Sequence, residues 1–152
     1  MDVNNLIEDK RFVRYVIDKC ITCHKMMSLM EERPTYDHNV YCPFHDNTQS
    51  PSARLYKNKD GSDTLFCFSE HRTYRSSDFI TKGLVNYRLE SIFYKVWIKL
   101  PKETQELLLN NYQGDVSYVP EKFKESLELM QTFREGKINI SELNQLILDS
   151  LK

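Results

Sequence analysis

The sequence predicts an α+β fold, in which a small antiparallel β module is preceded by a helix and followed by an all-helical tail. Three observations predict this order. Apolar residues recur three or four apart over the first 32 residues, as in an amphipathic helix. Residues 40–75 are instead rich in short aromatic and β-prone runs. From residue 76 onward the helical spacing returns, interrupted by proline and by capping residues.

The N-terminal helix is expected to end at Arg33-Pro34. Its apolar stripe contains Cys20 and Cys23, which belong to a C-x-x-C-H string of the kind to which c-type haem is attached. Haem attachment requires export, and the first residues do not resemble a secretory signal. We therefore expect a cytoplasmic protein without haem. Core packing is the favoured role of the two cysteines, with zinc binding by this pair as the open alternative.

The β module is expected to contain a hairpin. Its strands are predicted at residues 52–57 and 64–68, and Asp60-Gly61 between them is a strong turn signal. Val40-Tyr41 is a further β-prone dipeptide ahead of these strands. Together these runs predict a small antiparallel sheet.

Helices are predicted through the remainder of the chain. Ser76, Ser77 and Asp78 form a capping signal, and Pro101 suits the start of a later helix. The expected helices cover residues 76–84, 87–99, 101–109, 120–136 and 141–151. A boundary near residues 83–86 would divide a module at residues 1–84 from a helical tail at residues 85–152, which we expect to dock a partner.

Charge is unevenly distributed although the net charge is only −1. Residues 54–102 hold ten Lys and Arg against five Asp and Glu, a local charge of +5, whereas residues 103–152 hold five against nine, a local −4. A basic middle favours an anionic partner there, although scattered surface charge explains it as well. The chain has no run of about 18 apolar residues, so we expect no membrane span.

Two Cys/His pairs flank the predicted hairpin. Cys42 and His45 form a C-P-F-H string, and Cys67 and His71 follow on the returning strand. Two cysteines and two histidines at such spacings can close a tetrahedral zinc site, and the hairpin would bring the pairs together. We therefore predict one structural zinc ion in a zinc-ribbon-like module, which acts by stabilising the fold and not by catalysis.

The same segment resembles the zinc-binding domain of bacterial and phage-type (DnaG-like) DNA primases, the Cys-His-Cys-Cys class. The resemblance covers about residues 5–84. The matching strings are C-P-F-H at 42–45, Ser50-Pro51-Ser52, Phe66-Cys67-Phe68 and Asp78-Phe79-Ile80. In the family the fourth ligand is a Cys three residues after the third. That position is Glu70 here, and His71 follows it. Because a histidine side chain reaches further than a cysteine, one extra residue is tolerable, so we assign the fourth ligand to His71. Glu70 is less favoured, and Cys20 or Cys23 are substitutes.

The resemblance implies that the module contacts single-stranded DNA template and helps a separate polymerase domain to start primers. Cations on and after the hairpin would neutralise phosphates, and interleaved aromatic rings would stack on unpaired bases. The candidate DNA-binding residues are Arg54, Tyr56, Lys57, Lys59, Arg72, Tyr74 and Arg75.

The motifs of the family's primer-synthesising domain are missing. That domain uses a Glu-Gly motif and a D-x-D pair, and this chain has only Glu135-Gly136 and no D-x-D. We therefore expect no catalysis by this chain alone. The first hypothesis is a replication accessory protein that works with a separate primase polymerase domain or replicative helicase. The alternative is a zinc-scaffolded adaptor that regulates a replication or transcription enzyme without contacting DNA.

Overall fold

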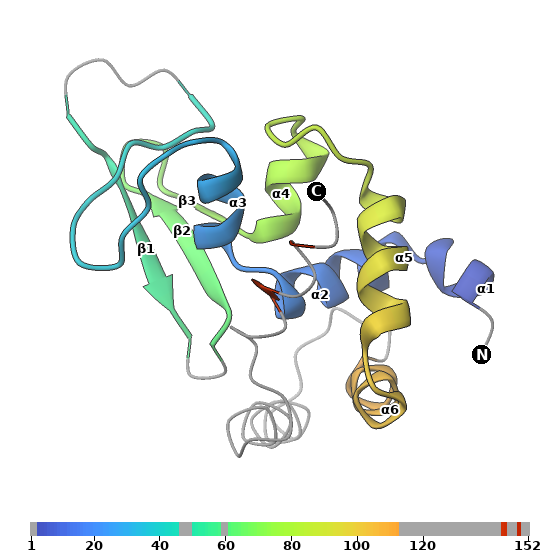
Figure 1. Cartoon of the computed structure of the whole chain (residues 1–152). Helices are drawn as coiled ribbons and strands as arrows, with labels where there is room; N and C mark the ends of the chain where they lie inside the picture. The colour runs from blue at the N-terminus through green and yellow to red at the C-terminus, as the bar shows by residue number, and fades with distance from the viewer. Residues whose placement is uncertain (1–2, 46–49, 59–60, 113–143, 146–148, 150–152) are drawn as a thin grey trace.

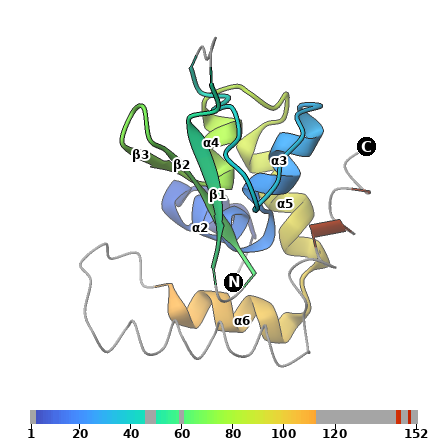
Figure 2. The ribbon, with the colours of Figure 1, turned by 90° about the vertical axis from the view of Figure 1, so that its left-hand side faces the viewer.

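The computed structural model describes residues 3–45, 50–58, 61–112, 144–145 and 149, and it confirms the α+β class (Figure 1). One face of a three-stranded antiparallel sheet, here called the inner face, packs against helices. In Figure 2 the sheet lies toward the viewer and these helices lie behind it. No helix in the described ranges covers the outer face of the sheet (Figures 1 and 2). Among the described residues, the sheet therefore has one face packed on helices and one face that no helix covers.

The predicted hairpin is confirmed. Strand β1 (Ala53–Lys57) pairs antiparallel with β2 (Asp63–Cys67), with Leu55 opposite Leu65. A third strand, β3 (Arg72–Tyr74), pairs antiparallel with β2. The sequence pattern did not predict β3, because three residues are too few to show an alternation.

Alternation along the strands separates the two faces of the sheet, because successive side chains point to opposite sides. The buried positions of the strands are Ala53, Leu55, Asp63, Leu65, Cys67 and Tyr74. The positions between them, on β1 and β2, project outward. This alternation decides which of the candidate DNA-binding residues can reach a ligand.

The expected N-terminal helix is instead three helices: α1 (Val3–Ile7), α2 (Lys10–Cys20) and α3 (Cys23–Leu29). The prediction of one continuous helix was wrong because two side chains cap new helix starts. Asp9 Oδ1 accepts hydrogen bonds from the Arg11 and Phe12 amides, and Thr22 Oγ1 accepts one from the Lys25 amide at 3.0 Å. Such caps satisfy amides that a continuing helix would have paired internally.

Three of the later helices lie where they were predicted: α4 (Ser76–Thr81), α5 (Leu89–Lys99) and α6 (Lys102–Asn111). The start of α4 differs in detail, because its N-cap is Arg75, whose amide donates to Asp78 Oδ2 at 2.8 Å. Pro101 precedes α6 as expected. The helix predicted at 120–136 lies outside the described residues, as does most of the one at 141–151.

The hydrophobic core crosses the predicted boundary near residue 84. Phe12 of α2 packs edge-on against Phe93 and Trp97 of α5, with ring centroids 6.0 and 5.6 Å apart. Leu108 of α6 is also fully buried in this core. The described helices of the predicted tail are thus packed onto the N-terminal module (Figure 1). In the described part of the chain, no helix combines the length and the apolar character that crossing a membrane requires.

Candidate metal centre and exposed sheet face

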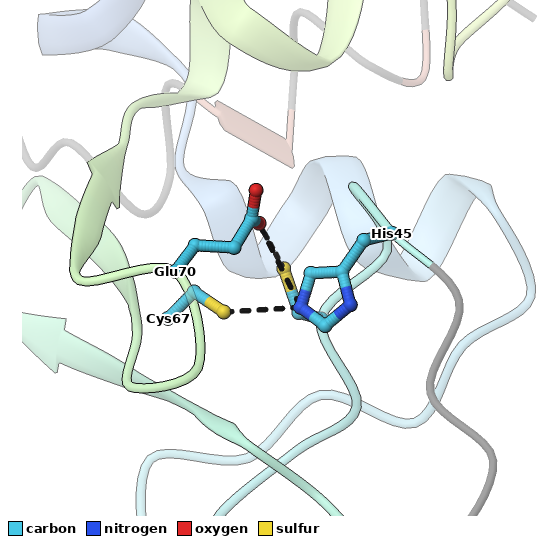
Figure 3. Close-up of side chains that lie close together, drawn as sticks. His45, Cys67 and Glu70 are labelled. Carbon is cyan, nitrogen blue, oxygen red and sulfur yellow. Dashed lines mark hydrogen bonds and ion pairs between the residues drawn. The ribbon is translucent and has the colours of Figure 1, made fainter.

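Four candidate metal ligands meet at one end of the sheet (Figure 3). Val40, just before Cys42, forms a β-bridge with Ala53, and Ala53 in turn pairs with Cys67 at the end of β2. This register brings the Cys42 loop beside Cys67, and the turn from β2 to β3 adds a carboxylate. The group is Cys42, His45, Cys67 and Glu70, whose ligand atoms all lie within 4.8 Å of one another.

The distances within this group bracket those between the ligands of a tetrahedral zinc ion. His45 Nε2 lies 3.1 Å from Cys67 Sγ and 3.6 Å from Glu70 Oε1. Cys42 Sγ lies 3.9 Å from the same Glu70 oxygen. With metal–sulfur bonds of about 2.3 Å and metal–nitrogen or metal–oxygen bonds of about 2.0 Å, neighbouring ligands of a tetrahedral ion are about 3.3–3.8 Å apart. Two thiols, an imidazole and a carboxylate are also donors that zinc accepts.

The two thiols have different acidities. Burial opposes ionisation of Cys67, but hydrogen bonds from the backbone of Glu70 and from His45 outweigh it and lower the pKa of Cys67. Burial raises the pKa of Cys42 to about 12, and the neighbouring Cys67 sulfur adds to this effect. The metal-free centre therefore loses its first thiol proton from Cys67, and metal binding must displace the proton of Cys42.

Glu70, not His71, is the fourth member of the group. His71 is exposed, and its backbone is in the left-handed region with φ of 51°. The turn therefore directs residue 70 toward Cys67 and leaves residue 71 outside the cluster. The family spacing, in which the fourth ligand lies three residues after the third, would have identified Glu70. The preference for His71 rested on the longer reach of a histidine side chain, which would tolerate one extra residue between the third and fourth ligands.

Tyr74 was expected to stack on bases, and the structure contradicts this expectation. Its side chain is only 2% exposed, because Tyr74 lies opposite Leu65 on the inner face of the sheet. Its ring stacks on Phe44 with centroids 3.8 Å apart, and its hydroxyl donates to Glu70 Oε1 at 3.0 Å. Burial and the Glu70 carboxylate raise the pKa of Tyr74 to about 12, so the hydroxyl remains a donor. Tyr74 therefore packs beside the candidate metal site and hydrogen-bonds one of its four residues.

Cys20 and Cys23 are not part of the cluster. Both are fully buried, on either side of the break between α2 and α3. Burial raises the pKa of Cys20 to about 12 and that of Cys23 well above its usual value, where the Asp63 carboxylate adds to the effect. Their burial agrees with the favoured prediction of core packing.

The outer face of the sheet presents aromatic rings beside a cation. Arg54 and Phe66 are cross-strand partners on this face, with Tyr56 farther along β1 and Phe68 at the other end. Tyr56 is 45% exposed and Phe68 is 42% exposed. The rings of Phe66 and Phe68 meet edge to face with centroids 5.2 Å apart. We call Arg54, Tyr56, Phe66 and Phe68 the aromatic face.

Two of the other predicted cations do not belong to this face, because Lys57 and Arg72 lie two residues from the inward-facing Leu55 and Tyr74 and so project to the other side of the sheet. Lys57 Nζ lies 5.6 Å from the ring centroid of Tyr36. The Arg72 guanidinium lies 5.1 Å from that of Tyr74, and Arg75 is exposed at the start of α4. Lys59 lies outside the described residues. Phe66 and Phe68 were not among the predicted binding residues, because the sequence alone did not show which face of the sheet they occupy.

Comparison with known proteins gives no relative. No protein-family model matches the chain, and no curated protein or solved structure matches it. The resemblance to primase zinc-binding domains therefore rests on the sequence strings at the metal centre and in the strands beside it.

Proposed function

We propose that this protein binds single-stranded DNA on the aromatic face and acts as a non-catalytic accessory of primer synthesis. One observation carries the proposal: Tyr56 and Phe68 stay about half exposed on an open sheet, with Arg54 between them. Exposed aromatic rings beside cations form a stacking platform for unpaired bases, whose π-faces are hidden in a duplex. The resemblance to primase zinc-binding domains favours DNA as the ligand.

In this proposal Cys42, His45, Cys67 and Glu70 hold a zinc ion. A bound zinc ion supplies a cross-link between the Cys42–His45 loop and the turn that follows β2. The protein residues then fix the end of β2, and with it the orientation of Phe66 and Phe68 on the aromatic face. The chain would act with a separate primase polymerase domain or a replicative helicase.

The test is fluorescence anisotropy of a labelled single-stranded oligonucleotide titrated with zinc-loaded protein at two salt concentrations. Binding should weaken as salt rises, because phosphate neutralisation releases counterions. Each of Tyr56→Ala and Phe68→Ala should weaken binding by about 1–3 kcal/mol, about 5-fold to 150-fold in Kd. Tyr94→Ala is the matched control, since Tyr94 is 46% exposed but lies on α5. Equal affinities for all three variants would refute the proposal.

A second candidate function is a protein-binding adaptor, favoured by a separate observation. Tyr94 and Ile98 lie one turn apart on the outer side of α5 and are 46% and 56% exposed. Adjacent exposed apolar side chains on a helix are a common feature of protein contacts. If the chain binds no oligonucleotide even at low salt, the adaptor becomes the better explanation.

A further inference from the structure

A short extended segment beside β1 adds one more aromatic ring to the outer face of the sheet. Val40 and Ala53 form an antiparallel bridge, in which each backbone amide donates to the carbonyl oxygen of the other residue, at 2.8 and 3.0 Å. Both side chains of this bridge are buried, and so is Cys42, two residues after Val40. Because successive residues of an extended chain point to opposite sides, Tyr41 projects outward, where it is 49% exposed.

Tyr41 and Phe68 lie on either side of Ser52. The register of the antiparallel bridge places Tyr41 next to Ser52 on one side. On the other side, the Phe68 amide donates to the Ser52 carbonyl oxygen at 2.8 Å. Neighbouring strands are about 4.8 Å apart, so the backbones of the two aromatic residues are about 10 Å apart, with the small side chain of Ser52 between them. We call Tyr41 and Phe68 the ring pair.

The backbone positions of the ring pair are fixed by contacts on both faces of the sheet. Cys42 follows Tyr41 and Cys67 precedes Phe68. Both cysteines are buried and belong to the group whose ligand atoms lie within 4.8 Å of one another. The two backbone segments therefore converge beneath the ring pair. On the outer face, the ring of Phe66 meets that of Phe68 edge to face.

Arg54 supplies a cation on the same side of the sheet. It occupies the next outward position of β1 after Ser52, and its Nη2 donates to the Asp37 carbonyl oxygen at 3.3 Å. Asp37 lies on the segment that leads to Tyr41, so the guanidinium is held on the Tyr41 side of β1. A guanidinium carries five N–H donors, and this bond leaves donors for phosphate oxygens. No acidic side chain occupies an outward position on the described strands.

The spacing and the chemistry of the ring pair fit two stacked bases. Bases stack at intervals of about 3.4 Å along a DNA strand, so a ring, two bases and a second ring span three intervals, or about 10 Å. Every base has a π-face on which aromatic side chains stack. A dinucleotide also brings a phosphate for Arg54, which an apolar side chain of a protein partner would not.

We infer that the ring pair binds two stacked, unpaired bases of single-stranded DNA, one on each ring, while Arg54 contacts the phosphate that joins them. This inference rests on the proposed DNA-binding function and specifies what the end of the sheet nearest the metal centre binds. The bound strand crosses this end from Tyr41 over Ser52 to Phe68. Tyr41 is thereby a DNA-binding residue outside the aromatic face.

The test is fluorescence anisotropy of a labelled oligothymidine titrated with the full-length, zinc-loaded protein. Tyr41→Ala should weaken binding about 5-fold to 150-fold in Kd, because one stacking contact is lost. Tyr41→Phe keeps the ring and should bind like the wild type, as should the control Tyr94→Ala on α5. An oligomer of abasic residues carries the phosphates without bases. Tyr41→Ala should bind this oligomer as tightly as the wild type does.

Double variants test whether the two rings act on one stack. If both rings bracket the same two bases, removing the second ring costs less once the first is gone. The fold-loss in Tyr41→Ala/Phe68→Ala should therefore be smaller than the product of the two single losses. Tyr56 lies farther along β1 and stacks on a different base, so Tyr41→Ala/Tyr56→Ala should give the product within about 2-fold.

Each outcome bears on a different claim. An unchanged Kd in Tyr41→Ala, with weaker binding in Phe68→Ala and Tyr56→Ala, overturns the ring pair while the DNA-binding function stands; a protein contact would then explain the exposed Tyr41 better. Fully multiplicative losses at Tyr41 and Phe68 overturn the shared stack. An equal loss on the abasic oligomer overturns stacking, because Tyr41→Ala would then act through folding or phosphates. Unchanged affinity in every variant overturns the proposed function, and with it this inference.

Discussion

The Asp63 carboxylate connects the hairpin to the start of α3, and its loss should be strongly destabilising. Asp63 is only 4% exposed at the first position of β2. Its Oδ1 accepts the amide hydrogen of Cys23 at 2.5 Å. Its Oδ2 accepts that of His24 at 3.1 Å and the hydroxyl of Tyr36 at 2.7 Å. A carboxylate at this position also suits the positive end of a helix.

The size of the effect follows from which donors would be left without a partner in Asp63→Ala. The Cys23 amide is buried, so losing a hydrogen bond to a charged group there should destabilise by about 1.5–3 kcal/mol. His24 and Tyr36 are half-buried, so water can replace part of each bond, and each should add about 0.5–1 kcal/mol. The total is about 2.5–5 kcal/mol. Asp63→Asn keeps one acceptor oxygen and should lose only about 1–2 kcal/mol.

Urea unfolding of the zinc-loaded protein measures this loss. The single tryptophan, Trp97, is 5% exposed in the core on α5 and reports global unfolding by its fluorescence. Thr22→Ala is the matched control, because it removes only the local cap of the same helix and should destabilise by about 1 kcal/mol. A loss below about 1 kcal/mol in Asp63→Ala, with an unchanged urea dependence, would refute this account of the Asp63 bonds.

Three further predictions concern Asp18, Tyr74 and the thiols. Burial raises the pKa of Asp18 above its ordinary value of 3.8. The stability that protonated Asp18 contributes is therefore present below pH 3.8, and it is lost as the pH rises through the pKa of Asp18 in the folded protein. Asp18→Asn should therefore become more stable relative to wild type between acidic and neutral pH in parallel urea titrations. Tyr74→Phe should weaken zinc binding about 10-fold to 100-fold in a chelator competition, because it removes the Glu70 hydrogen bond; unchanged affinity would contradict that role. Because the pKa of Cys42 is about 12, calorimetry in buffers of different ionisation enthalpy should detect at least one proton released per zinc bound at neutral pH.

Local sequence patterns predicted the regular elements well, and long-range contacts explain where they failed. The β-prone runs at residues 52–57 and 64–68, with the Asp60-Gly61 turn signal between them, correctly predicted the hairpin. The helical spacing of apolar residues runs through Thr22 without interruption, so it concealed the break between α2 and α3. That break is stabilised by Asp63, which lies 40 residues away in sequence. No local pattern contains this partner.

Three of the four clustered ligands were predicted, because the C-P-F-H string and the hairpin determine where Cys42, His45 and Cys67 lie. The fourth depended on the backbone of a turn, in which the positive φ of His71 leaves Glu70 facing the cluster. The error at Tyr74 has a similar origin. An aromatic residue among cations suggests base stacking, but the unpredicted strand β3 turns its ring inward.

Stacking on the aromatic face is the central claim, and a tryptophan placed there tests it most directly. Phe68→Trp puts an indole at a position that is 42% exposed, whereas the native Trp97 is buried. Stacking on a base should quench the new emission, so titration with single-stranded DNA should give saturable quenching. Tyr94→Trp places the same probe on α5 and should be unaffected. Equal quenching at both positions, or none at position 68, would contradict the proposed DNA-binding role of the sheet.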